Sequence, residues 1–119
     1  MAKAVSDDRG KSHDDLAPLL AAMFKEFQEA ARKKPDAVLN AQKVRIVNRL
    51  LTDVLAILDG EPSRTYLELL KEDDLPQNSD VTLMLGQVVA AMDAFKERYY
   101  TFGSGWGRLR MAQRKSPPI

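Results

Sequence analysis

The apolar pattern between Asp80 and Tyr100 constrains the fold of this chain more than any other feature. Apolar side chains recur there at spacings of three and four residues, which places them on one side of an α-helix. Ser79 is a suitable N-cap residue, and Asp80 suits the positive end of the helix dipole. We therefore expect one long amphipathic helix here. Its apolar positions are Val81, Met84, Leu85, Val88, Met92, Phe95 and Tyr99.

The opposite side of this helix carries small residues. Gly86, Ala90 and Ala94 lie four residues apart and project there together with Leu83. Glycine inside a helix is less favourable than alanine by about 1 kcal/mol, so Gly86 requires a reason such as the close approach of another backbone. A second helix of this chain or of a second copy would supply that reason, whereas a solvated alanine face would show the same pattern. We predict self-association through these four residues.

Two further stretches have the same helical period. The first is expected over residues 15–33, with Pro18 in its first turn, where a missing N–H is tolerated. The second is apolar over nearly half its circumference, which is typical of a central helix with two or more neighbours. Its start is ambiguous because either Asp36 or Asn40 could cap it. Gly60 is expected to end it.

A shorter helix is expected between Pro62 and about residue 70, followed by an acidic turn. Together the four stretches predict an all-α fold, a small antiparallel helical bundle of three long helices and one short helix. The broad apolar side of the second helix and the small residues of the last one both favour a homodimer. The expected core consists of Leu20, Met23, Phe24, Phe27, Val47, Leu51, Val54, Leu58, Val88, Met92 and Phe95.

Both ends of the chain lack this period. Residues 1–13 are polar and mixed in charge, so we expect a disordered N-terminal arm in which His13 is solvated. The helical bundle is expected to span residues 14–102. Residues 103–119 begin with three glycines at alternate positions and carry only basic charges, so we expect a flexible basic C-terminal tail.

Composition bears on the compartment. The chain has no cysteine, which fits a reducing environment. Its first residues contain no apolar segment of a secretion signal. No stretch approaches the roughly 20 apolar residues that span a bilayer. We expect a cytoplasmic protein that does not enter a membrane.

Patterns that would support catalysis or metal binding are weak. The lack of cysteine excludes disulfides, thiolate metal sites and a cysteine nucleophile. Ser104 lies between glycines but follows an expected helix, whereas a phosphate loop or a nucleophile elbow follows a strand. The acidic residues Glu72, Asp73 and Asp74 lack the spacing of a calcium-binding loop. We therefore predict no catalytic residue, no cofactor and no metal, and a chain that is not an enzyme.

Charge is distributed unevenly along the chain. Residues 61–80 carry two positive and six negative side chains, whereas residues 101–119 carry four positive and no negative ones. The basic tail could bind a protein partner, nucleic acid or nothing at all. We predict a non-enzymatic protein–protein interaction or regulatory module, with a nucleic-acid-binding protein that uses the tail as the alternative. The partner-binding candidates are Trp106, Arg108, Arg110, Arg114 and Lys115.

Overall fold

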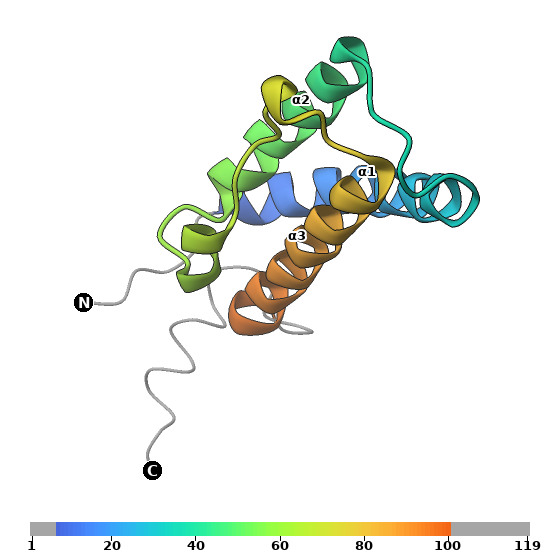
Figure 1. The fold of residues 1–119 in the computed structure, drawn as a ribbon. Helices are drawn as coiled ribbons and strands as arrows, with labels where there is room; N and C mark the ends of the chain where they lie inside the picture. The colour runs from blue at the N-terminus through green and yellow to red at the C-terminus, as the bar shows by residue number, and fades with distance from the viewer. Residues whose placement is uncertain (1–6, 101–119) are drawn as a thin grey trace.

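The computed structural model describes residues 7–100, and this part of the chain is mostly helical (Figure 1). It contains three α-helices, which are α1 (Asp7–Lys33), α2 (Ala41–Ile57) and α3 (Asn78–Tyr99). Within residues 7–100 there is no strand, only an isolated antiparallel bridge between Val38 and Gln77. The predicted all-α fold is confirmed.

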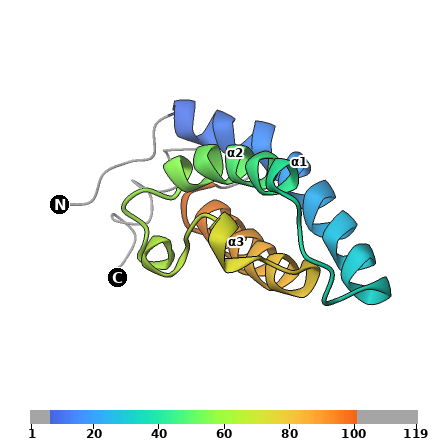
Figure 2. The same ribbon diagram turned by 45° about the horizontal axis from the view of Figure 1, so that its top comes forward.

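Helix α1 begins earlier than the apolar period indicates. Residues 7–13 are helical, so the prediction of a disordered arm is wrong for them, while residues 1–6 lie outside the described range. Acidic residues at the start of α1 suit the positive end of its dipole. Pro18 lies inside the helix rather than in its first turn. Proline removes a backbone donor and distorts a helix interior, and α1 is not straight in Figure 2.

Helix α2 resolves the ambiguity about its start. Asn40 is the N-cap residue, and its Oδ1 atom accepts a hydrogen bond from the Lys43 backbone N–H at 2.8 Å. The helix ends at Ile57, slightly before the predicted end. Gly60 follows in a left-handed conformation with φ of 84°, which a glycine adopts without a steric penalty.

Helix α3 begins one residue before the expected cap. Gln77, not Ser79, is the N-cap residue, and the Asp80 carboxylate accepts a hydrogen bond from the Gln77 backbone N–H at 2.9 Å. This contact satisfies a donor that the helix itself leaves without a partner. Lys96 and Arg98 lie in the last turn, where positive charge is favourable.

The predicted short α-helix does not form. Residues 58–77 instead make a long connection with two short 3₁₀ helices, Pro62–Tyr66 and Glu72–Asp74. The Asn48 side chain of α2 holds this connection through Leu70, accepting from its N–H at 2.8 Å and donating to its carbonyl at 3.0 Å. The connection therefore runs back along α2.

This return fixes the direction of the helices. The segments before α2 and α3 lie together, because the Leu39 N–H donates to the Pro76 carbonyl at 2.9 Å. Both helices therefore start at the same end and run the same way, so the prediction of an antiparallel bundle is wrong for this pair. Helix α1 is antiparallel to them, and it lies beside α3 in Figure 1. His13 near the start of α1 contacts Met92 near the end of α3, and Phe27 near the end of α1 contacts Thr82 near the start of α3.

The core lies between the three helices, and Leu39 and Leu67 contribute to it from the connections. Most of the predicted core residues are buried. Met23, Phe24 and Phe27 of α1 are only partly buried, which corrects the prediction for them. The expected residues that the core does contain are Leu20, Val47, Leu51, Val54, Leu58, Val88, Met92 and Phe95.

Candidate interaction surface

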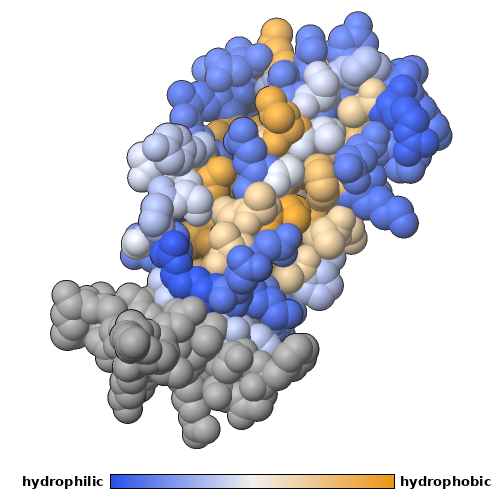
Figure 3. Space-filling model, turned by 90° about the horizontal axis from the view of Figure 1, so that it is seen from below, coloured by the Kyte–Doolittle hydropathy of each residue, from blue (hydrophilic) through white to orange (hydrophobic). Residues whose placement is uncertain are grey.

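One side of α3 leaves apolar residues open to solvent. The Leu83 side chain is 69% exposed, and Ala90 and Ala94 are also exposed, whereas Gly86 is partly buried. Figure 3 views the molecule from below, where α1 and α3 lie, and shows an apolar area with hydrophilic residues around it. The sequence predicts self-association for four residues of α3, which are Leu83, Gly86, Ala90 and Ala94.

Gly86 has a neighbour within the chain. A Cβ atom placed on Gly86 would lie 3.4 Å from Cζ of the Phe24 ring on α1. The missing side chain thus allows the aromatic ring to pack against the backbone of α3. The close approach that the glycine predicts is therefore made, at this position, by a helix of the same chain.

The position of α1 explains why Leu83 stays exposed. The Thr82 hydroxyl lies 3.0 Å from the Phe27 carbonyl of α1 and 2.8 Å from the Asn78 carbonyl of its own helix. Helix α1 therefore covers the side of α3 that carries Thr82 and Gly86. Leu83 lies on a part of α3 that α1 does not cover, so its side chain stays exposed. We name the surface formed by Phe24, Leu83, Gly86, Ala90 and Ala94 the α1–α3 face.

A second group of residues joins the first turns of α1 to the last turns of α3. His13 is only 3% exposed, so the prediction of a solvated histidine is wrong. Its Nε2 atom lies 3.0 Å from the Met92 carbonyl, and it must donate because a carbonyl only accepts. Its ring stacks on Phe95, with centroids 5.8 Å apart, and the Arg9 guanidinium lies 5.1 Å from the Phe95 centroid.

The end of α3 is also tied to the connection 58–77. The Tyr99 hydroxyl donates to one carboxylate oxygen of Glu61 at 2.8 Å, and Arg98 donates to the other at 3.2 Å. Tyr99 packs edge-on against Phe95. Both groups of polar contacts satisfy buried or half-buried polar atoms inside the fold, which is what burial of such atoms requires. Their geometry is that of structural contacts between helix ends.

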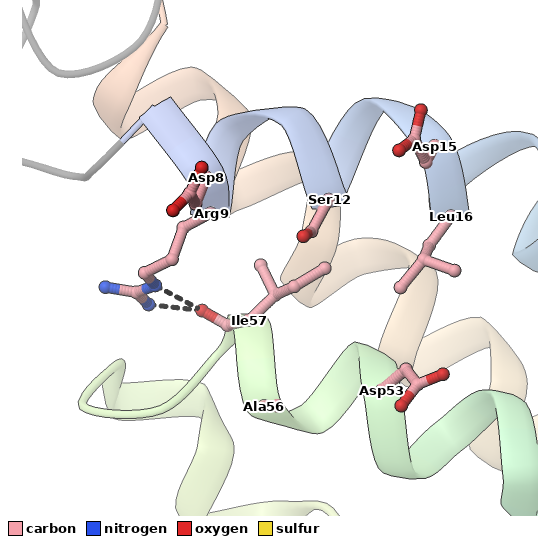
Figure 4. A pocket seen from close by; sticks show the side chains of 8 residues that line it. All are labelled: Asp8, Arg9, Ser12, Asp15, Leu16, Asp53, Ala56 and Ile57. Atoms are coloured by element: carbon pink, nitrogen blue, oxygen red, sulfur yellow. Dashed lines mark hydrogen bonds between the residues drawn. The ribbon is translucent and has the colours of Figure 1, made fainter.

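A groove of about 420 Å³ lies between α1 and α2 (Figure 4). Arg9 projects from α1 and donates to the Ile57 carbonyl and, at 3.1 Å, to the Asp59 carbonyl. It thereby supplies positive charge to the last turn of α2, which has no basic residue of its own. The groove is lined by Asp8, Arg9, Ser12, Asp15, Leu16, Asp53, Ala56 and Ile57.

The described residues form neither a metal-binding cluster nor a membrane-spanning helix. No group of three or more histidine, cysteine, aspartate or glutamate residues within residues 7–100 is arranged to hold a metal ion. None of the helices in the same range is long and apolar enough to cross a membrane. The predicted partner-binding residues Trp106, Arg108, Arg110, Arg114 and Lys115 lie outside the described residues.

Arg9 and His13 are not among the site residues that the sequence predicts. A signal for both exists, because Arg9, His13, Leu16 and Leu20 are spaced by four, three and four residues and therefore share one side of a helix.

Comparisons with protein-family models, with curated proteins and with solved structures find no match for this chain.

Proposed function

We propose that this chain is a non-enzymatic interaction module that assembles as a homodimer through the α1–α3 face. The observation that carries the proposal is the exposure of Leu83 above a row of small residues on the same helix. Full burial of a leucine side chain is favourable by about 1.5–3 kcal/mol. The small exposed side chains of Ala90 and Ala94 let the backbone of a partner helix come close enough to bury it.

A second copy fits the charges that surround this face. Asp93 and Glu97 are exposed in the second half of α3, whereas Lys25 and Arg32 are exposed in the second half of α1, beside the first half of α3. In a two-fold arrangement with antiparallel α3 helices, Asp93 and Glu97 of one copy lie near Lys25 of the other. Opposite charges then meet twice.

A stable dimer interface must include surface from both α1 and α3. A stable interface buries about 800 Å² on each partner, more than one narrow row on α3 supplies. The half-buried ring of Phe24 extends the apolar area from α3 onto α1. Aromatic residues in the centre of an interface commonly contribute most of its binding energy.

Sedimentation velocity of three proteins tests this assignment. The Ala90→Glu variant places a carboxylate in the middle of the face, and glutamate is a good helix former, so the monomer should keep its fold. The matched control is Gln42→Glu, which adds the same charge at an exposed position of α2. We expect the wild type and the control to sediment as dimers and the Ala90→Glu variant as a monomer, because an unpaired charge at the contact opposes association.

Two results would refute the proposal. Monomeric wild-type protein at high concentration removes the homodimer. Equal association of the wild type and both variants shows that the chains meet through another surface.

A further inference from the structure

We propose that the groove between α1 and α2 binds the basic C-terminal segment of the same chain, residues 101–119. The groove combines an apolar floor with an acidic border. Leu16, Ala56 and Ile57 supply the apolar side chains, and three aspartates supply the charge. Figure 4 shows that these groups come from both walls, α1 and α2.

The charge of the groove is negative. The carboxylates of Asp8, Asp15 and Asp53 are exposed and form no ion pair or hydrogen bond with another residue in the range 7–100. Arg9, the single basic residue of the lining, directs its guanidinium at the Ile57 and Asp59 carbonyls and lies over the Phe95 ring. The Arg9 guanidinium therefore interacts with the carbonyls at the end of α2 and not with the three aspartates. The three carboxylates are thus accessible to a cationic ligand.

The C-terminal segment has the complementary chemistry. It carries four basic residues and no acidic ones, in contrast to the mixed charge of α1 and α2. Arginine pairs with carboxylates in a bidentate fashion. Leu109 and Met111 alternate with the first arginines and match the apolar floor.

The segment starts next to the groove. Helix α3 ends at Tyr99, and its last turns lie against the first turns of α1 through the His13–Met92 and Arg9–Phe95 contacts. From Tyr100 to Arg108 the chain spans up to about 26 Å when extended. Because the ligand is attached to its site, its effective concentration reaches about the millimolar range, so weak ion pairs suffice.

Trp106 makes this proposal measurable, because it is the only tryptophan of the chain and belongs to the segment. Its fluorescence anisotropy and its quenching by acrylamide report whether the segment is bound. We compare the wild type with the triple variant Asp8→Asn, Asp15→Asn, Asp53→Asn in the full chain. The matched control is a triple variant with the same loss of charge at exposed aspartates elsewhere, Asp36→Asn, Asp73→Asn, Asp74→Asn.

We expect the groove variant to lower the ratio of bound to released segment about ten-fold, because three exposed ion pairs are lost. Its Trp106 should become as mobile and as easily quenched as that of the wild type in about 1 M salt, where charge interactions are screened. The control should resemble the wild type. A second variant, in which Arg108, Arg110, Arg114 and Lys115 become glutamine, leaves the helices untouched and should release the segment as well.

Three outcomes would overturn the proposal. The first is equal Trp106 quenching in the wild type and the groove variant. The second is equal release by the control, which would mean that overall charge and not the groove holds the segment. The third is a signal that disappears on dilution, which would place the segment on another molecule. Repeating the measurement in the Ala90→Glu background separates this inference from the homodimer.

Discussion

At the scale of single residues, His13 is the polar group on which the packing of α1 depends most. Its ring fills a buried position against Phe95, and its Nε2 atom donates to the Met92 carbonyl. We predict that His13→Ala lowers the free energy of unfolding by about 2–4 kcal/mol, because a cavity and a lost hydrogen bond add together. Urea unfolding followed by circular dichroism measures this change.

The control for this experiment is Lys11→Ala, an exposed position two residues earlier on the same helix. It should change stability by less than about 0.5 kcal/mol. Equal stability of the two variants would mean that residues 7–13 are not packed against α3.

Leu75 provides a prediction with the opposite sign. It is the single non-glycine residue with positive φ in the range 7–100, with φ of 50°, and its side chain is 63% exposed. The left-handed conformation costs a leucine about 1–2 kcal/mol and is much easier for asparagine. We predict that Leu75→Asn raises the free energy of unfolding by about 0.5–1 kcal/mol.

Leu69→Asn is the control for Leu75→Asn, because Leu69 lies on the same connection, is 41% exposed and has a negative φ. It should lower stability slightly, since it removes a partly buried apolar side chain without relieving strain. A loss of stability in both variants would contradict the account of Leu75. Thermal unfolding of the two variants side by side measures the difference.

Single residues also mark the limit of what apolar spacing predicts. Eight of the expected core positions follow from apolar spacing and are buried. Arg9 and His13 continue the same spacing but are polar, and their burial depends on partners that are 48 and 79 residues away. No local pattern identifies such partners, so the sequence favours a disordered arm where the structure has helix.

At the scale of elements, the segment between α2 and α3 does not form the expected α-helix, and the Asn48 side chain binds it instead. The apolar residues of that segment suggest a short helix, yet a helix of so few residues is marginal alone. Asn48 instead binds both backbone groups of Leu70, and of the segment's apolar residues only Leu67 is buried. Cap signals in the sequence predict the helix starts only in part, because Asn40 is one of two candidates for α2, and Gln77 rather than Ser79 caps α3.

We predict that Asn48→Ala lowers the free energy of unfolding by about 2 kcal/mol, because the half-buried N–H and carbonyl of Leu70 lose their partner. Hydrogen exchange of residues 62–74 should become faster, while exchange in α1 changes little. Thr52→Ala is the control, since the exposed Thr52 hydroxyl bonds only to the Asn48 carbonyl within α2. Unchanged exchange in Asn48→Ala would contradict the role of Asn48.

At the scale of the whole molecule, the connection 58–77 makes α2 and α3 parallel. One side of α3 stays open to solvent, where Leu83 is 69% exposed. The helical period alone predicts that Leu83, Gly86, Ala90 and Ala94 share a side. It does not predict that Phe24 occupies the space at Gly86, because that depends on where α1 crosses α3. What covers the remaining α1–α3 face is the central question about this protein.

Disulfide trapping answers this question most directly, because the chain has no cysteine of its own. Ala90 lies in the middle of the exposed row, and a residue near a two-fold axis meets its own copy. We predict that Ala90→Cys forms a covalent dimer rapidly under mild oxidation, whereas Gln42→Cys, at an exposed position of α2, forms no covalent dimer. Equal cross-linking of the two variants, or none in either, would contradict a homodimer through the α1–α3 face.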